Sequence, residues 1–277
     1  MSPTEILDRY HQCSGRTSDV FPFWLHASGQ CSYEMLVNRT SEAHTGDARI
    51  LDLACGDGYF LNLLWEKGFH HLTGSDRSGA ELEAARERLT SAVRLDRADA
   101  HRQPYDDRSF DLVTCHMALM LMKPLAPVLT EIARILKSGG RLIALVPRPL
   151  LDPVMDCYRE ALQTVCAETG LKPLQLGDPQ LSRRNAATRL LEACGLGGEV
   201  RLEDLVVQRS GSVEALWNAM AASYDVFRLP TTARTRLRQR VSAKWRTLSS
   251  DGDSLTCRMG LRLITAVRME GRDPSPQ

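Results

Sequence analysis

The amino-acid sequence predicts an α/β protein with a doubly wound, seven-stranded, mostly parallel sheet, an N-terminal helical cap and a C-terminal helical insertion. From residue 49 onward, short apolar runs alternate with longer amphipathic runs. This alternation is typical of strands joined by right-handed helical crossovers, which cover both faces of a parallel sheet. A glycine-containing turn, GDG at 56–58, directly follows the first apolar run, where such sheets bind their ligands.

Seven apolar segments are predicted to be strands. The first, RILDLAC, leads directly into the glycine turn, the third is weak, and the last is long. Because they are short apolar runs bounded by glycine, aspartate or proline, they fit buried strands. The predicted strands cover residues 49–55, 70–76, 93–99, 109–117, 141–147, 199–208 and 255–268.

Apolar residues at helical spacing fill the gaps between these strands. The helix after the first strand ends at Gly68, and the helix before the fifth strand is expected to be closed by Gly139 and Gly140, since glycine commonly stops a helix. The predicted helical segments cover 59–68, 78–92 and 124–140 and, less regularly, 151–195 and 211–249.

These elements divide the chain into four parts. Residues 1–47 precede the first sheet strand, and we expect them to pack as a helical cap over the C-terminal edge of the sheet. Residues 48–148 form the ligand-binding core. Residues 149–270 complete the sheet and supply helical walls for a substrate pocket, and residues 271–277 are expected to be a disordered tail.

Composition excludes several classes of protein. The 277 residues carry a net charge of +1, which argues against a protein that coats nucleic acid. No apolar run reaches the roughly 18 residues that cross a membrane, and the N-terminus lacks a signal-peptide pattern. Eight cysteines form no CxxC pair, and the histidines and carboxylates lack metal-ligand spacing. We therefore expect a cytoplasmic protein with free thiols and no metal.

The turn after the first strand is the first candidate binding element. Glycines at 56 and 58 allow the backbone to pass close beneath a ligand. A dinucleotide site would place a third glycine at position 61, which is Leu61 here, and no GK[ST] follows, so a P-loop is excluded.

Acidic residues end the second and third strands as well. Asp76 can accept hydrogen bonds from both hydroxyls of a ribose, since a carboxylate offers two oxygens. Asp99 can accept from an exocyclic amine, while the backbone of Ala100 meets a ring nitrogen. With Asp52 in the first strand, the three acids predict that one nucleoside spans three neighbouring strand ends.

At this point the chain resembles the class I S-adenosylmethionine-dependent methyltransferases with a type-11, small-molecule methyltransferase domain. The similar segments, in order, are ILDLACGDGYF, LTGSDRS, ADAHRQPYDDRSFDLV and LTEIARILKSGGRLIALV, which together span about 48–148. The resemblance implies a Rossmann-like methyltransferase fold, S-adenosyl-L-methionine as cofactor and S-adenosyl-L-homocysteine as product. Two departures are Ala54, where the family usually has the first glycine, and Met120, where many members have a histidine.

The resemblance also implies which residues bind the cofactor. Gly56 and Gly58 would line it, Asp76 would hold the ribose, and Asp99 with Ala100 would read the adenine. The cofactor-binding set it implies is Asp52, Ala54, Cys55, Gly56, Asp76, Arg77, Asp99, Ala100, Cys115 and His116, the last two beside the methionine portion.

Catalysis is expected to rely mainly on proximity and orientation, since effective molarities of about 10⁵ M or more follow from positioning alone. If a general base is used, the candidates are His116, His26 and Tyr10, with His11 also able to face the pocket. The aromatic run at 21–24 and Tyr10 could form a lid over the sulfonium.

The predicted function is methyl transfer to a small-molecule acceptor, in secondary or natural-product metabolism, by a monomer or homodimer. The arginine-rich segment 231–246 is interpreted as a solvated helix, so binding of nucleic acid is not expected. The alternatives are methylation of RNA or of a protein, a non-catalytic regulatory subunit that binds the cofactor, and use of the sulfonium charge without methyl donation.

Overall fold

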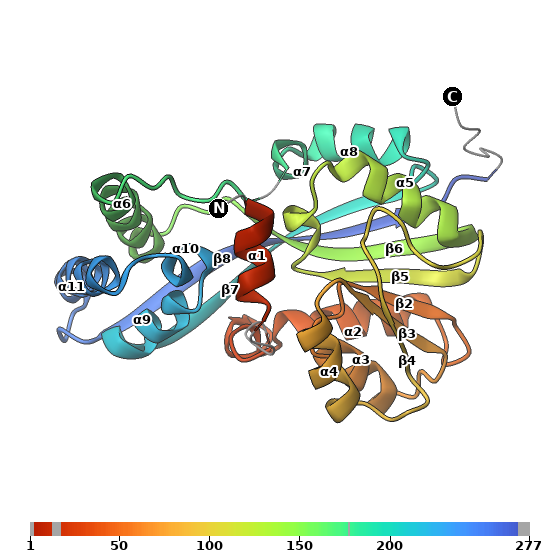
Figure 1. Ribbon diagram of the computed structural model, residues 1–277, viewed down its shortest axis with the longest axis horizontal. Coiled ribbons are helices and arrows are strands. Elements are labelled where there is room, and N and C mark those ends of the chain that lie inside the picture. Colours follow the sequence, from red (N-terminus) through yellow and green to blue (C-terminus); the bar gives the residue numbers. More distant parts are fainter. Residues whose placement is uncertain (1–2, 13–17, 177, 271–277) are drawn as a thin grey trace.

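A computed structural model describes residues 3–12, 18–176 and 178–270, which contain one eight-stranded sheet with strand order β1-β7-β8-β6-β5-β2-β3-β4 (Figure 1). The central strands are parallel, whereas β8 is antiparallel to β6 and β7, and β1 is antiparallel to β7. The strands are β1 (Leu25–His26), β2 (Ile50–Leu53), β3 (Leu72–Asp76), β4 (Arg94–Arg97), β5 (Phe110–His116), β6 (Leu136–Arg148), β7 (Val200–Ser212) and β8 (Ser254–Val267).

The predicted doubly wound fold class is confirmed, and the predicted count of seven strands is corrected to eight. The additional strand is β1, whose Leu25 pairs with Gln208 on the edge strand β7. Two residues carry too little pattern to be recognised as a strand, because alternation needs about four residues to be visible.

Helices cover both faces of the sheet (Figure 1). Successive side chains of a strand point to opposite faces, so Ile50 and Leu112 join one buried cluster and Leu51 and Val113 the other. The α-helices are α1 (Pro3–Tyr10), α2 (Ser32–Ala43), α3 (Tyr59–Glu66), α4 (Gly79–Arg88), α5 (Leu125–Ile135), α6 (Pro153–Glu168), α7 (Pro179–Ser182), α8 (Arg184–Ala193), α9 (Val213–Ala221), α10 (Tyr224–Phe227) and α11 (Thr231–Leu248).

The helix predicted over 124–140 is shorter than expected. Helix α5 ends at Ile135, and the chain continues at once into β6, where Leu136 pairs with Phe110 before a shift in register. Gly139 has φ of +71°, and a Cβ on Gly140 would lie 2.8 Å from the Lys137 oxygen. The two glycines therefore form an irregular stretch within a strand, not the end of a helix.

Residues 1–47 were predicted to be a helical cap, and the described part is more varied. Helix α1 lies beside the C-terminal edge of the sheet, but a short 3-10 helix, Phe21–Phe23, and strand β1 follow it. Helix α2 then packs against α3 and β6 on a face of the sheet. The tail at 271–277 and Cys13 lie outside the described residues.

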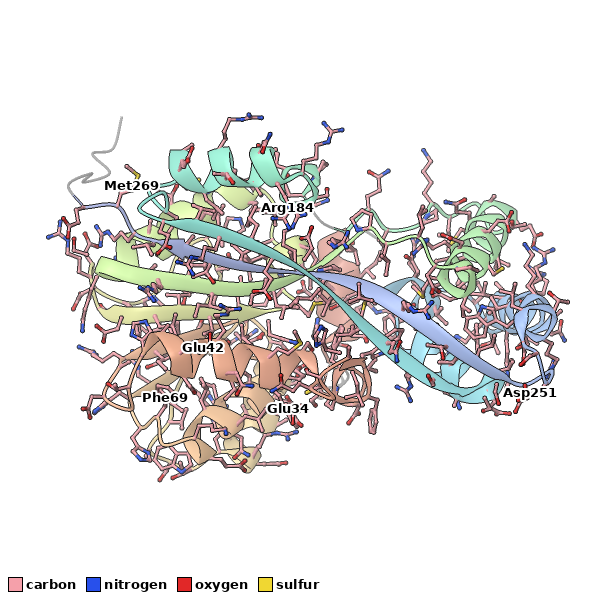
Figure 2. All side chains as sticks on the ribbon, turned by 180° about the vertical axis from the view of Figure 1, so that it is seen from behind. Glu34, Glu42, Phe69, Arg184, Asp251 and Met269 are labelled. Atoms are coloured by element: carbon pink, nitrogen blue, oxygen red, sulfur yellow. The ribbon has the colours of Figure 1, made fainter. Side chains whose placement is uncertain are left out.

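Strands β7 and β8 extend well beyond β6. They pair from Val200 with Ala266 to Ser212 with Ser254, whereas β6 pairs with β8 only as far as Gly260. The extension is the long twisted ribbon of Figure 2. Helices α6, α9, α10 and α11 gather on it (Figure 1), which places a helical lobe beside the carboxyl ends of the central strands.

Among the described residues, no helix is both long and apolar enough to span a bilayer. The seven cysteines in this part of the chain are all free. No group of three or more histidine, cysteine or acidic side chains in the described ranges is arranged to hold a metal ion.

Trp245 holds α11 against α6, and its replacement tests this packing. Its side chain is fully buried, and Nε1 donates a hydrogen bond to the Val154 oxygen at 2.8 Å. Trp245→Phe removes this hydrogen bond and leaves a small cavity, so we expect the free energy of unfolding to fall by about 2 kcal/mol or more. Urea unfolding measures this, with the half-buried Trp65→Phe as control; equal losses in both variants would contradict it.

Candidate active site

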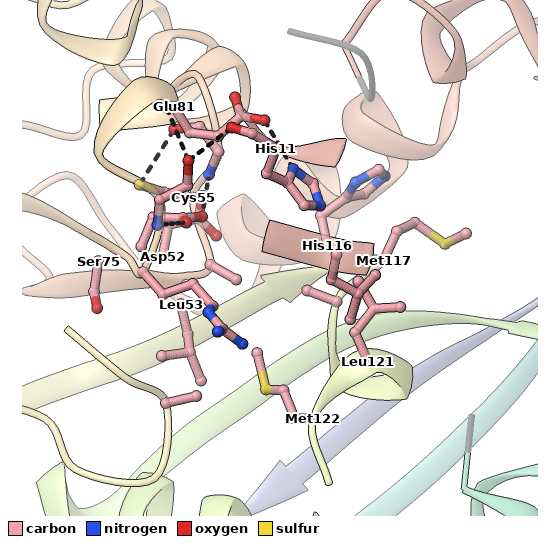
Figure 3. A pocket seen from close by; sticks show the side chains of 18 of the residues that line it. His11, Asp52, Leu53, Cys55, Ser75, Glu81, His116, Met117, Leu121 and Met122 are labelled. Atoms are coloured by element: carbon pink, nitrogen blue, oxygen red, sulfur yellow. Dashed lines mark hydrogen bonds and ion pairs between the residues drawn. The ribbon is translucent and has the colours of Figure 1, made fainter. Parts of the chain in front are cut away.

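A cavity of about 540 Å³ lies at the carboxyl ends of β2, β3, β4 and β5 (Figure 3). This is the edge of an open α/β sheet at which ligands bind, and the volume lies within the range of small-molecule sites. Its walls come from the strand ends, from α1 and α4, and from segments near 117–123 and 175–176, with Tyr224 added by the helical lobe.

The turn after β2 forms the floor of this cavity. Ala54 and Gly56 both have positive φ, +60° and +54°, so alanine takes the left-handed conformation that the family pattern assigns to glycine. The nearest atom to a Cβ built on Gly56 is Glu81 Oε2 at 3.9 Å, which leaves open space above this backbone. Cys55 also lines the cavity, and its backbone N donates to the Ser75 oxygen at 3.1 Å.

Gly58 does not have the role implied by the resemblance. It begins α3 with φ of +76°, and a Cβ there would lie 2.7 Å from Leu89 Cδ1 and 3.2 Å from Ala85 Cβ. The glycine is therefore needed for close packing of α3 on α4, and it is not part of the cavity lining.

Asp76 connects two turns at the end of β3. Its Oδ2 accepts a hydrogen bond from Gly56 N at 3.0 Å, and its Oδ1 accepts one from Ser78 N at 2.8 Å. Burial raises the pKa of Asp76 against the lowering effect of these two bonds. Each oxygen retains a lone pair, so the carboxylate is held in place and can still accept from a ligand.

Asp52 is buried beneath the same floor, with 2% of its surface exposed. Thr114 Oγ1 donates to its Oδ1 at 2.9 Å. The pKa of Asp52 is raised to about 7, mainly because the group is buried. The hydrogen bond from Thr114 works against this rise, and the negative charge of Asp76 adds to it. A carboxyl group with such a pKa can respond to a positively charged ligand by losing its proton.

The end of β4 supplies Asp99 and Ala100, which both line the cavity. Asp99 Oδ1 accepts from the backbone N of His101 at 2.9 Å and lies 2.7 Å from His101 Nδ1. The hydrogen bond from the His101 backbone is the main reason that the pKa of Asp99 is lowered. Arg77 also lines the cavity, and its Nη2 pairs with Asp8 of α1 at 2.7 Å.

The resemblance implies that Cys115 and His116 both lie beside the cofactor, but only His116 lines the cavity. The fully buried Cys115 packs in the cluster beneath α5 and is not part of the cavity lining. Adjacent residues of a strand point to opposite faces, so this rule alone could have separated them. Burial also raises the pKa of the Cys115 thiol.

His116 is held by the start of α2. Its Nε2 lies 2.9 Å from Ser32 Oγ, and its ring stacks on Tyr33 with centroids 3.8 Å apart. The Phe21 ring forms a T-shaped contact with it, with ring centroids 5.5 Å apart. Because burial lowers the pKa of His116 to about 3, the ring is neutral near pH 7 and is a weak base.

The other two predicted catalytic residues lie outside the cavity lining. His26 belongs to the edge strand β1, and its Nδ1 is 3.0 Å from Ser28 Oγ. Tyr10 is buried in the contact between α1 and the helical lobe, where its hydroxyl donates to the Ala222 oxygen. Its neighbour His11 lines the cavity instead.

His11, which is expected from the sequence to be able to face the pocket, forms a set with Glu81 and Tyr224, two residues that the predicted sites did not include. His11 Nδ1 lies 2.9 Å from Glu81 Oε1, and its Nε2 lies 3.1 Å from the Tyr224 hydroxyl. All three residues line the cavity. They come from segments distant in sequence, so no local spacing could have indicated the set.

The aromatic run at 21–24 does not act as one lid. Phe21 contacts His116, whereas Trp24 is 2% exposed within the core. Phe23 is 59% exposed, with the Arg209 guanidinium 5.1 Å from its ring.

The remaining cavity wall is apolar and rich in methionine. Its side chains follow β5 and continue through a 3-10 helix, Leu119–Leu121, with further contributions from α1 and the segment before α7. Methionine is unbranched and polarisable, so such a wall can adapt to a flat apolar ligand. The apolar lining residues are Leu7, Met117, Ala118, Met120, Leu121, Met122 and Leu176.

The basic segment 231–246 forms most of α11, and three of its alternating arginines are in ion pairs. Arg236 and Arg240 pair with Glu168, and Arg238 pairs with Glu214. These exposed pairs fit the predicted solvated helix.

Fold and site together define a nucleoside-binding α/β protein with an adjoining apolar pocket. Residues 51–144 match the family model described as "Methyltransferase domain". A demethylmenaquinone methyltransferase from Clavibacter sepedonicus is 38% identical over 120 residues, which are 41% of this chain and 49% of that protein. A 2-phytyl-1,4-naphtoquinone methyltransferase from Synechococcus elongatus is 35% identical over 164 residues, 56% of this chain and 67% of that protein.

Solved structures agree in fold. The YcgJ protein from Bacillus subtilis has a TM-score of 0.59 at 18% identity, over 86% of this chain and all of the other. The chain belongs to the class I S-adenosylmethionine-dependent methyltransferases, whose cofactor is S-adenosylmethionine. It spans about half the length of the demethylmenaquinone methyltransferases it matches.

The residues present fit this cofactor. Asp76 is held by two hydrogen bonds and keeps lone pairs for a ligand. Asp99 and Ala100 line the cavity near the end of β4. Gly56 has no side chain, so a ligand can approach its backbone from the cavity. The buried acid at Asp52 suits the positively charged methionine end, because a cation favours the ionised carboxylate.

The two turn glycines should fail in different ways when replaced. Gly58→Ala forces a Cβ against Leu89 at positive φ, so we expect a loss of about 1–3 kcal/mol in the free energy of unfolding. Gly56→Ala places its Cβ in the cavity, so we expect weaker S-adenosylmethionine binding with a stability cost of only about 1–2 kcal/mol. Urea unfolding measures the stability of each variant, and calorimetry measures its affinity for S-adenosylmethionine. The roles given to the two glycines would be contradicted if a fully folded Gly58→Ala bound the cofactor more weakly while Gly56→Ala bound it normally.

Asp52 should make stability depend on pH. Because its pKa is about 7 when folded and ordinary when unfolded, the folded chain holds a proton that the unfolded chain releases. The free energy of unfolding therefore falls as pH rises from about 4 to about 7, by about 1.4 kcal/mol per unit of pKa difference.

Urea unfolding at pH 5 and pH 8 measures this decline. Asp52→Asn should lose most of it and be the more stable protein at pH 8, with a remainder from the raised pKa of Asp76. The exposed Asp106→Asn is the control. A wild-type chain whose stability rises over this range would contradict the buried, protonated Asp52.

Proposed function

We propose that the protein transfers a methyl group from S-adenosylmethionine to a small, largely apolar acceptor in secondary or natural-product metabolism. The observation that carries this proposal is the continuity of the cavity. It runs from the anchored carboxylate of Asp76 to the methionine-rich wall at 117–122, so cofactor and acceptor can lie in one continuous cavity.

The chain contributes mainly positioning. When bound, S-adenosylmethionine supplies a methyl group activated by its positively charged sulfur. Asp76 would accept hydrogen bonds from the ribose hydroxyls, Asp99 and Ala100 would meet the adenine, and Asp52 would favour the charged methionine end. Holding donor and acceptor in line supplies about 7–11 kcal/mol of the barrier in well-oriented reactions, and the apolar wall excludes water.

The relatives support an apolar ring as acceptor. Two of them are named for demethylmenaquinone and 2-phytyl-1,4-naphtoquinone, and Met117, Met120 and Met122 form a wall suited to a flat ring. These alignments cover 41% and 56% of the chain, and Tyr224 of the helical lobe also reaches the cavity. We therefore carry over only the kind of acceptor, a small apolar ring, as the proposal.

The test is transfer of a labelled methyl group. The full chain is incubated with methyl-labelled S-adenosylmethionine and a panel of naphthols, naphthoquinols and phenols, or with RNA or a protein extract. We expect label in a small organic product. Label in RNA or protein would favour the macromolecular alternatives, and cofactor binding without any transfer would overturn the proposed function.

A matched pair of variants tests whether the acceptor binds against the methionine-rich wall at 117–122. Met122→Ala enlarges the acceptor end and should raise the acceptor KM at least several-fold, whereas Met259→Ala, a partly buried methionine outside the cavity lining, should not. Unchanged kinetics in Met122→Ala would place the acceptor elsewhere.

A further inference from the structure

We propose that Glu81, His11 and Tyr224 form a proton relay that accepts the proton of a hydroxyl group on the acceptor. The proposal rests on the proposed methyl transfer and makes it more specific: the transfer is to oxygen, on a phenol or alcohol, and Tyr224 is the catalytic residue. His11 and Glu81 act through it.

The hydrogen bonds fix the direction of the relay. A carboxylate can only accept, so the contact of 2.9 Å between Glu81 Oε1 and His11 Nδ1 places the imidazole proton on Nδ1. The lone pair of Nε2 then faces the Tyr224 hydroxyl at 3.1 Å and accepts its proton. The Tyr224 oxygen is thereby left with lone pairs available to a ligand in the cavity that this residue lines.

The set is anchored from both ends. The Glu81 side chain is 4% exposed in the first turn of α4. The backbone oxygen of His11 accepts from Ser78 Oγ at 2.8 Å, and the Tyr10 ring lies 4.3 Å from the Tyr224 ring. Figure 3 shows the side chains of His11 and Glu81 joined at the cavity. A buried acid, an oriented imidazole and a hydroxyl group on a residue that lines the cavity have the arrangement of a relay.

The step balances in atoms and charge. The acceptor O–H bond breaks as its proton passes to the Tyr224 oxygen, and the Tyr224 proton passes to His11 Nε2. The oxygen's electron pair forms the bond to the methyl carbon, and the electron pair of the broken C–S bond stays on sulfur. The positive charge lost from sulfur reappears on the His11 imidazolium, which Glu81 stabilises.

His116 cannot serve this purpose equally well, although it lines the same cavity. Its Nε2 contacts Ser32, and burial lowers its pKa to about 3, so it holds a proton poorly. A hydroxyl acceptor must lose its proton as it attacks, whereas an amine can attack first. The presence of a relay with a paired acid therefore favours a hydroxyl acceptor.

The alternative is that the same three residues have only a structural role, a latch in which their contacts hold α1 against the helical lobe. A latch and a relay differ in pH dependence, because only a relay requires an unprotonated His11. Turnover through a relay should therefore rise with pH, whereas turnover should not depend on the protonation of His11 if the three residues only hold α1 in place. The titratable and charged groups facing His11 or its immediate neighbours are Glu81, Asp76, Tyr10, Tyr224 and the pair Asp8–Arg77.

The experiment compares Tyr224→Phe with Tyr158→Phe in the full chain. Both remove one hydroxyl from the same lobe, but Tyr158 bonds Ser223 at 2.9 Å and does not line the cavity. Methyl transfer to 1-naphthol and a panel of phenols and alcohols is followed against pH, together with S-adenosylmethionine affinity and imidazole ¹⁵N resonances.

We expect Tyr224→Phe to lower turnover by about 10²-fold or more, to lose the rise with pH and to shift the His11 Nε2 resonance. Cofactor affinity and all behaviour of Tyr158→Phe should stay as in the wild type. Equal turnover in the two variants, an intact pH profile in Tyr224→Phe, or a proton on Nε2 instead of Nδ1 would overturn the relay. So would a wild type that binds cofactor but methylates no hydroxyl in the panel, whereas failure to bind cofactor would instead overturn the proposed function.

Discussion

The two hydrogen bonds that Asp76 accepts, from Gly56 N and Ser78 N, are the interaction on which the site depends. They join the turn after β2 to the turn after β3, so that two strand ends become one rigid floor. The parallel register of β2 and β3, with Leu53 beside Ser75, brings the turns together. Such preorganised geometry strengthens binding, because a ligand that finds its partners already in place loses less conformational entropy.

Burial gives the groups around this floor different chemistry. The same desolvation that raises the pKa of Asp52 to about 7 lowers that of His116 to about 3, because low dielectric disfavours charge of either sign. The site thus contains a neutral imidazole, an acid that a cationic ligand can ionise, and the set Glu81, His11 and Tyr224. The β7–β8 ribbon matters because it carries the lobe that brings Tyr224 to the cavity edge.

The core could be predicted because its signals are local. Asp52, Gly56, Asp76 and Asp99 each end or follow a strand, and parallel strands present their carboxyl ends at one edge. The acceptor side could not, because it joins segments far apart: His11 meets Glu81 and Tyr224 at separations of 70 and 213 residues. Other errors were avoidable, since strand alternation already separates Cys115 from His116. The two-residue β1 carries no readable pattern.

The measurement that tests the account most directly is a calorimetric titration of the full chain with S-adenosylmethionine, repeated on Asp76→Ala and on the exposed Asp106→Ala. Hydrogen bonds to a charged group contribute about 1.5–3 kcal/mol each. We therefore expect stoichiometric binding to the wild type and to Asp106→Ala with equal affinity. The affinity of Asp76→Ala should be weaker by at least about 10 to 100-fold. No binding to the wild type, or equal binding in Asp76→Ala, would contradict this account.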